Sequence, residues 1–119
     1  MQYLLLIYVG DMNPGEAQIR KIVGGHKEFR EGLRSNGKYR DSKPLEPAST
    51  ATTVRVRNGK TLTIDGPFAE TKEQLGGYYL VDADNLDDAI SMAERLPEAK
   101  EGAIEIRPVN MALLGEDER

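Results

Sequence analysis

The chain contains no cysteine, no tryptophan and a single histidine. The absence of cysteine excludes disulfides, thiolate-bound zinc, iron–sulfur clusters and thiol catalysis. One histidine leaves only carboxylate-rich metal sites, so we expect neither a metal nor another cofactor. The sequence also lacks a Gly-x-Ser-x-Gly elbow, a dinucleotide-binding fingerprint and a phosphate-binding loop.

Long apolar runs are absent as well. The first run, residues 3–9, is far shorter than the roughly 20 residues that span a bilayer. It also lacks the basic flank and the small-residue cleavage site of a signal peptide. These absences predict a cytoplasmic protein without a membrane partner.

The length of 119 residues and the mass of 13.2 kDa fit one domain. A folded chain of that mass exposes roughly 6,400 Å², against about 19,000 Å² when unfolded. Residues 1–60 hold 11 Lys and Arg and 6 Asp and Glu, whereas residues 61–119 hold 5 and 14. Such asymmetry is typical of a basic binding surface or of complementary faces in one domain. A pI of 5.1 and the lack of interleaved aromatics favour the second interpretation, without direct nucleic-acid binding.

The first half of the chain predicts a strand, a helix and an edge strand. Residues 3–9 predict a strand that is covered on both faces or lies at the centre of a sheet. A helix begins with Asn13 as N-cap and Pro14 at its first position, and Asn36-Gly37 ends it. Within it, Gly24-Gly25 predicts a close backbone approach to a strand or a kink. Two prolines confine any strand in residues 39–47 to a sheet edge. The apolar stripe of the helix consists of Ile19, Ile22, Val23, Phe29 and Leu33.

A hairpin is predicted over residues 52–64, around Asn58-Gly59. A two-residue loop would place Arg55 opposite Leu62 and mix apolar with polar side chains on each face. A three-residue loop over residues 57–59 places Val54 opposite Leu62 instead. We therefore expect the longer loop, with Gly59 in the left-handed conformation of a bulge.

The second half predicts a turn at residues 65–68 and one helical turn over residues 71–74, ended by Gly76-Gly77. A strand follows at residues 78–81, and either Asp84 or Asn85 caps a second helix. Residues 103–109 predict the last strand, with Ile104 on one face and Arg107 on the other. The second helix faces the core through Leu86, Ala89, Ile90, Ala93 and Leu96.

This order predicts a single α+β domain over residues 1–109 and a flexible C-terminal tail over residues 110–119. Two right-handed crossovers give a ferredoxin-like, mainly antiparallel sheet with both helices on one face and the hairpin inserted. The other face of the sheet is too apolar for water. We therefore expect a homodimer through the sheet faces.

Residues 65–78 resemble a known family, and the resemblance extends to the first strand, to residues 51–57 and to residues 105–109. The block is Asp65-Gly66-Pro67-Phe68-Ala69-Glu70-Thr71-Lys72-Glu73-Gln74-Leu75-Gly76-Gly77-Tyr78. It strongly resembles the YCII-related family, in its DGPF-domain branch. The resemblance implies a ferredoxin-like fold of the dimeric α/β-barrel type. A few relatives resemble small-molecule enzymes, one of them a dehydrochlorinase, and others occur with sigma factors. A histidine–aspartate pair implied by the resemblance maps onto His26 and Asp65.

His26 lies on the apolar stripe of the first helix. Histidine suits general acid–base catalysis when a carboxylate orients its second ring nitrogen, and Asp65 is the candidate for that role. The alternatives are a packed histidine bonded to a backbone carbonyl and an aspartate that only caps a turn. Arg107, Tyr8 and Tyr78 are candidates for binding a small anionic or phenolic ligand, and Tyr79 could also line a pocket or donate a hydrogen bond. An ion pair suits Arg107 about as well, and sheet or interface packing suits the tyrosines better.

Two functional hypotheses follow. The first is a small-molecule enzyme, of lyase or isomerase type, that uses acid–base chemistry at His26 and Asp65. The alternative is a non-catalytic ligand- or partner-binding module, associated with a sigma factor in transcription regulation. Convergence of His26 and Asp65 on a cavity would favour the first.

Overall fold

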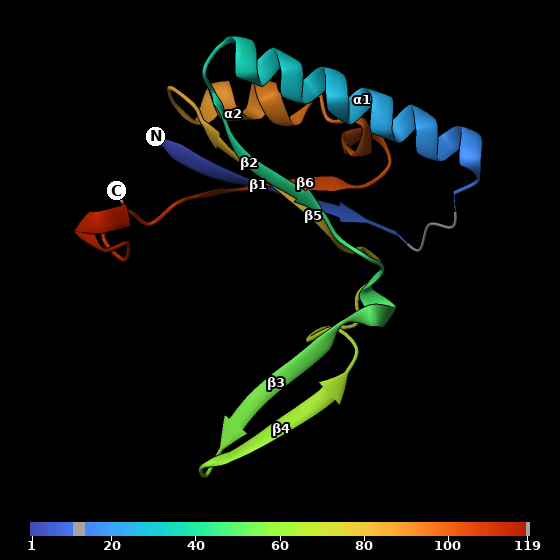
Figure 1. The fold of residues 1–119 in the computed structure, drawn as a ribbon, viewed down its shortest axis with the longest axis vertical. Helices are drawn as coiled ribbons and strands as arrows, with labels where there is room; N and C mark the ends of the chain where they lie inside the picture. Colours follow the sequence, from blue (N-terminus) through green and yellow to red (C-terminus); the bar gives the residue numbers. More distant parts are fainter. Residues whose placement is uncertain (11–13, 119) are drawn as a thin grey trace.

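The computed structural model describes residues 1–10 and 14–118. Its centre is a four-stranded antiparallel sheet in the order β2-β5-β1-β6 (Figure 1). The strands are β1 (Gln2–Val9), β2 (Tyr39–Pro44), β5 (Gln74–Asp82) and β6 (Ala103–Pro108). The helices are α1 (Glu16–Ser35) and α2 (Leu86–Ala93), with short 3-10 turns η1 (Ala48–Thr50), η2 (Pro97–Lys100) and η3 (Glu116–Glu118). A separate hairpin joins β3 (Thr52–Arg57) to β4 (Lys60–Asp65).

Both helices lie on one side of this sheet (Figure 1). Alternate residues of β1, namely Tyr3, Leu5 and Ile7, are buried beneath them. Because side chains alternate along a strand, Leu4 and Leu6 face the other side, where they are only half-buried. The predicted α+β, ferredoxin-like fold is confirmed. Of the two interpretations of residues 3–9, the central strand is confirmed, because β1 lies between β5 and β6. Cover on both faces is not found in the single chain, where Leu4 and Leu6 stay half-buried. The core is completed by Leu33, Tyr79, Val81, Ala83, Ala89, Met92, Ala93 and Leu96.

The helix boundaries follow local signals only in part. The helix α1 ends before Asn36 and Gly37, which has a φ of 69°, as expected. Its start is different: the helix begins at Glu16 with Gly15 as N-cap, so Pro14 is not its first helical residue. Asn13 lies outside the described residues. At α2, Asn85 is the cap, and its side chain accepts a hydrogen bond from the amide of Asp88.

The predicted hairpin register is wrong. Arg57 pairs with Lys60 and Arg55 with Leu62, so the loop has only two residues, Asn58 and Gly59. Both have positive φ, 52° and 75°, as a type I′ turn requires. The expectation rested on one hairpin face being buried, but β3 and β4 pair only with each other and stay largely exposed. Turn chemistry therefore sets the register.

The helical turn predicted over residues 71–74 does not form. Gln74 is already the first residue of β5, and its side-chain amide donates back to the carbonyls of Ala69 and Thr71. Gly76 and Gly77 lie within β5 and cap nothing. A Cβ on Gly77 would lie 3.0 Å from the carbonyl oxygen of Lys43, so close strand packing explains that glycine.

Charges from the two halves of the chain meet inside the domain. Lys38 Nζ lies 2.7 Å from Asp88 Oδ2, and Arg40 Nε donates to Asp82 Oδ2 over 2.5 Å. These pairs support the interpretation of the charge asymmetry as complementarity within one domain. Among the described helices, none is long and apolar enough to cross a membrane.

Candidate active site

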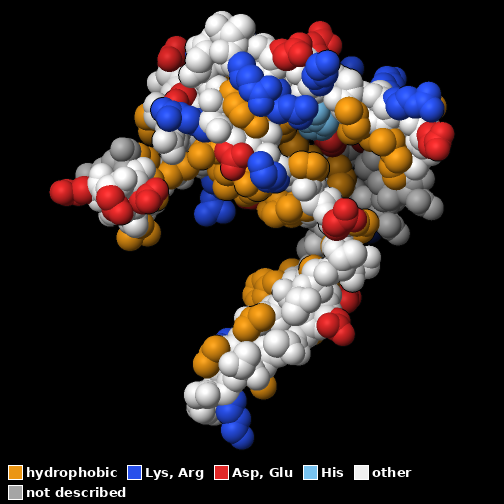
Figure 2. All heavy atoms as spheres, in the orientation of Figure 1, with side chains coloured by type: hydrophobic (Ala, Val, Ile, Leu, Met, Phe, Trp, Pro, Cys, Tyr) orange, Lys and Arg blue, Asp and Glu red, His pale blue; other side chains and the backbone are white. Residues whose placement is uncertain are grey.

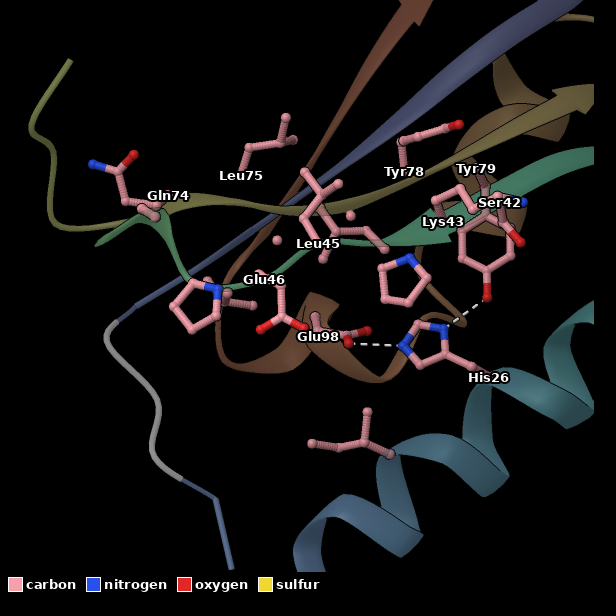
Figure 3. Close-up of a pocket in the computed structure, with 18 of the residues that line it drawn as sticks. His26, Ser42, Lys43, Leu45, Glu46, Gln74, Leu75, Tyr78, Tyr79 and Glu98 are labelled. Atoms are coloured by element: carbon pink, nitrogen blue, oxygen red, sulfur yellow. Dashed lines mark hydrogen bonds and ion pairs between the residues drawn. The ribbon is translucent and has the colours of Figure 1, made fainter. Parts of the chain in front are cut away.

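A cavity of about 930 Å³ opens between α1 and the strands β2 and β5, at the end of the sheet from which the hairpin leaves. Figure 3 shows its walls: Leu45 and Glu46 follow β2, Gln74 and Leu75 begin β5, and His26 projects from α1. Apolar residues make up most of these walls. Polar groups lie at both ends: Glu98 and Tyr79 beside His26, and Glu46 and Gln74 at the far end.

Both ring nitrogens of His26 have side-chain partners. Nε2 lies 2.7 Å from Oε2 of Glu98, and Nδ1 lies 2.7 Å from the hydroxyl of Tyr79 (Figure 3). A carboxylate only accepts hydrogen bonds, so Nε2 carries the proton that it donates to Glu98. In the neutral imidazole Nδ1 is then the acceptor, and the Tyr79 hydroxyl donates to it. The result is a continuous chain of two hydrogen bonds, from Tyr79 to His26 and from His26 to Glu98, which we call the relay.

Tyr79 is fixed by the core beneath the cavity. It comes from β5, is only 3% exposed, and packs edge-on against Phe29 and Tyr39. Burial raises the pKa of its phenol, while a hydrogen bond and the positive charge of Arg30 oppose that rise. The hydroxyl is thus held neutral, with a guanidinium positioned to stabilise negative charge on it.

Glu98 comes from η2, directly after Pro97. Burial by itself would raise the pKa of its carboxyl, but the hydrogen bond and the charge of His26 outweigh burial and hold that pKa below its usual range. Its side chain is 15% exposed, as is that of His26. Among the described residues, nothing bonds to its second oxygen, Oε1, although that atom is buried. The carboxylate can therefore both orient the imidazole and stabilise its charged form.

Close packing of α1 on η2 brings the carboxylate of Glu98 next to the imidazole of His26. A Cβ on Gly25 would lie 2.9 Å from Cγ of Pro97, whereas one on Gly24 would meet nothing within 4 Å. The close approach expected of the two glycines therefore exists, but at Gly25 alone and against η2, not against a strand.

The predicted site residues are not brought together. Asp65 ends β4 at the base of the hairpin, is exposed, and is not among the residues lining the cavity. Glu98 takes the place next to His26 that was expected of Asp65. Tyr78 contributes to the cavity wall, but its hydroxyl donates to Asp41.

Tyr8 and Arg107 lie on the sheet face away from the helices. Arg107 pairs with Leu4 across the β1–β6 ladder, and the Tyr8 hydroxyl donates to Glu105 over 3.3 Å. Burial and the neighbouring carboxylate of Glu105 raise the pKa of Tyr8. Neither residue lines the cavity beside His26.

Sequence reasoning missed Glu98 and Arg30, and it considered Tyr79 only as one of three tyrosines able to line a pocket or donate a hydrogen bond. The alternation of β5 could have identified Tyr79, because it shares the core face with Val81. Helical spacing could have identified Arg30, four residues after His26 on α1. Glu98 has no local signal, because only the packing of η2 against α1 brings it to the imidazole. No cluster of three or more His, Asp or Glu suited to a metal occurs in the described part of the chain.

An antiparallel sheet backed by two helices, with hydrogen-bonded His26 beside a cavity, defines an α+β domain with a candidate small-molecule site. A model of the YCII-related domain matches residues 1–111, and the chain belongs to that family. An uncharacterised protein of Rhizobium meliloti (strain 1021) is 46% identical over 74 residues, which is 60% of this chain. The match spans 60% of that relative's length as well.

A solved structure has a similar fold. It is a 5-chloro-2-hydroxyhydroquinone dehydrochlorinase from Burkholderia phenoliruptrix in complex with 2,5-dihydroxybenzoquinone. The alignment has a TM-score of 0.50 and 18% identity, and it covers 92% of this chain and 94% of the other. At that identity the likeness shows the fold alone.

Proposed function

We propose that this protein is a small-molecule enzyme that uses acid–base catalysis at His26. One observation carries the proposal: His26 is held on both ring nitrogens, by Glu98 and Tyr79, at the wall of a cavity of about 930 Å³. A merely structural histidine needs no cavity and no buried carboxylate. A fixed tautomer with a charge-stabilising partner is what a general base requires.

In the proposed first step, a substrate hydroxyl gives its proton to the Tyr79 oxygen while the Tyr79 proton passes to Nδ1 of His26. The imidazolium that forms is stabilised by Glu98, and the charge left on the substrate is stabilised by Arg30. Return of the proton to another substrate atom completes an isomerisation. Loss of an anionic leaving group, with the proton kept by the relay until product release, completes an elimination.

The cavity favours a planar, hydroxylated substrate. Its walls around Val23, Leu45 and Leu75 are apolar. Arg30 and the relay provide charge beside His26, and Lys43, Glu46 and Lys72 add charge elsewhere on the wall. This combination matches a phenol or quinone that becomes anionic during the reaction. The dehydrochlorinase of similar fold is bound to such a molecule, 2,5-dihydroxybenzoquinone, which supports the same substrate class here.

The experiment uses 2,5-dihydroxybenzoquinone as the binding probe and a panel of chlorinated and unchlorinated hydroxyhydroquinones as substrates. Binding is measured by calorimetry, and turnover by absorbance and chloride release. We expect binding by the wild-type chain, and a kcat/KM for His26→Asn about 10²- to 10⁴-fold lower. The matched control is Lys27→Met, which alters the next, exposed residue of α1 and should leave turnover unchanged.

Two results would contradict the proposal. If a folded His26→Asn variant has wild-type turnover, the imidazole is not the catalytic base. If no compound in the panel binds or raises the melting temperature, the proposed substrate class is wrong.

A further inference from the structure

One carboxylate on the cavity wall has no part in the reaction proposed above. It belongs to Glu46, in the segment between β2 and η1. Figure 3 shows its side chain directed toward the cavity interior, with Glu98 between it and His26 in this view. We call the part of the cavity around Glu46 the acidic end, and the part around His26 the relay end.

The fold holds Glu46 at this wall. Because Glu46 precedes Pro47, its backbone is restricted to extended conformations. Leu45, the residue before it, donates its amide hydrogen to the carbonyl of Gly76 over 2.9 Å, which ties the segment to β5. The 3-10 turn η1 begins directly after Pro47. Glu46 is therefore built into the wall, unlike a side chain on a free loop.

The carboxylate of Glu46 is available to a bound molecule. Within residues 1–10 and 14–118, no hydrogen bond or ion pair engages it. Gln74 also lines the acidic end, but its amide nitrogen already donates to the carbonyls of Ala69 and Thr71 and to the Thr71 hydroxyl. Both N–H groups of that amide are thus in use. Glu46 therefore favours a molecule that donates a hydrogen bond at this end.

The relay end has the opposite charge. Arg30 places a positive charge beside Tyr79 there. Figure 2 shows the single histidine, in pale blue, beside Lys and Arg side chains and beside hydrophobic ones. Leu45 and Leu75 provide apolar wall (Figure 3). The cavity volume of about 930 Å³ is near the upper limit of about 1,000 Å³ for small-molecule sites, so a single aromatic ring fills only part of it.

We propose that Glu46 selects substrates with a second hydroxyl group, at the end remote from the hydroxyl that ionises at the relay. This selection rests on the acid–base function proposed above, and it narrows the substrates to elongated diphenols with two rings. The simplest probe of that class is 4,4′-dihydroxybiphenyl. One hydroxyl meets Tyr79 at the relay end, the rings lie along the apolar wall, and the second hydroxyl donates to the Glu46 carboxylate.

The first measurement is the affinity of the full chain, by fluorescence titration, for three compounds that differ only at the remote end. They carry a hydroxyl, a methoxy group or a hydrogen there: 4,4′-dihydroxybiphenyl, 4-hydroxy-4′-methoxybiphenyl and 4-hydroxybiphenyl. A methoxy group accepts hydrogen bonds but donates none. We expect the diol to bind about 10-fold more tightly than either analogue, because only the diol donates to the charged acceptor.

The matched variants are Glu46→Met and Glu70→Met. Methionine has about the length of glutamate, but it is uncharged and its sulfur is only a weak acceptor. Both positions are exposed, so the chain retains its fold, and Glu70 does not line the cavity. The preference for the diol should disappear in Glu46→Met and persist in Glu70→Met.

The imidazole of His26 reports where the compounds bind, since the chain has one histidine. In ¹⁵N NMR spectra all three compounds should shift its ring nitrogens, in the wild type and in Glu46→Met. If they shift His26 but bind the wild type equally, the role of Glu46 is wrong while the relay site stands, and this comparison needs no variant. If none of them shifts His26, both proposals are wrong. A preference for the diol that survives in Glu46→Met would also overturn the selection by Glu46, because another group would then accept from the remote hydroxyl.

Discussion

The adjacent glycines of α1 allow a sharp test of how Glu98 is brought to His26. We consider Gly25→Ala and Gly24→Ala, two substitutions one residue apart on the same helix. Both add one methyl group and both gain the higher helix propensity of alanine, about 0.5–1 kcal/mol. They differ only in what the new methyl group meets.

At Gly25 the added Cβ would lie 2.9 Å from Cγ of Pro97, and at Gly24 nothing lies within 4 Å. Carbon atoms in contact prefer about 3.5–4.0 Å, so α1 and η2 must separate by roughly 0.6 Å or more. The proline ring is stiff and cannot move aside as a long side chain would. Overpacking of this kind costs about 1–3 kcal/mol. We therefore expect Gly24→Ala to stabilise the fold by about 0.5–1 kcal/mol and Gly25→Ala to destabilise it by up to about 2 kcal/mol.

The assay is urea unfolding of both variants and the wild type at one protein concentration, since an oligomer would make stability concentration-dependent. Pro97→Ala removes the atom that the new methyl group meets. In a double-mutant cycle it should therefore restore most of the stability lost in Gly25→Ala. Binding of 2,5-dihydroxybenzoquinone should weaken in Gly25→Ala and not in Gly24→Ala, because only the former shifts Glu98 from His26.

Equal stabilisation by the two alanines would refute the reasoning. It would mean that α1 and η2 do not approach closely at Gly25, and the geometry of the relay would lose its support.

Two further predictions concern single polar side chains. Glu98→Gln should cost about 1–2 kcal/mol at neutral pH, since the charge-assisted bond to His26 is lost. The pKa of Glu98 is held below its usual range, so its contribution is complete above the ordinary glutamate pKa, about 4.3, and is lost as the pH falls through its lower native pKa. The stability gap between wild type and variant should therefore be present at neutral pH and shrink as the pH falls below about 4.3. The exposed control Glu101→Gln should show no such gap, and a gap unchanged at acid pH would contradict the pairing. Asn85→Ala removes the cap of α2 and should lower the free energy of unfolding by about 1 kcal/mol, measured by chemical denaturation. Asp84→Ala should lower it by less than about 0.5 kcal/mol, because the ion pair of Asp84 with Lys38 is long and exposed. The reverse order would assign the cap to Asp84.

Much of the fold could be predicted because its signals are local. The apolar run of β1, the glycine stop of α1 and the Asn85 cap each depend on neighbours in sequence. The stripe predicted for α1 is confirmed only in part, because Leu33 is buried and Phe29 packs on the core whereas Ile19 and Val23 are exposed. Once strands and helices are placed, the handedness of crossovers leaves few arrangements, and the ferredoxin-like order is among them. The errors concern segments whose structure was predicted from burial that the tertiary structure does not provide. The hairpin register was derived from a buried face that the hairpin does not have, so the Asn58-Gly59 turn decided it.

Of the hydrogen-bonded groups at the candidate site, His26 was the one whose role was predictable, and Tyr78 was correctly expected at the cavity. The position of His26 on the apolar stripe of α1 directs it toward the sheet, and the sequence has no other imidazole. Its partners come from β5 and from η2, 53 and 72 residues away along the chain. Asp65 was a reasonable partner on the family resemblance, but β4 leaves the sheet and takes that carboxylate into the hairpin.

By itself, then, the sequence determined the elements, their order and the one residue able to act as a base near neutral pH, because helix caps, turn residues and hydrophobic periodicity act between near neighbours. Only the tertiary structure decided which carboxylate and which phenol face that base. The contact of Gly25 with Pro97 and the burial of Tyr79 under α1 depend on how separate elements pack. No short stretch of sequence records that packing.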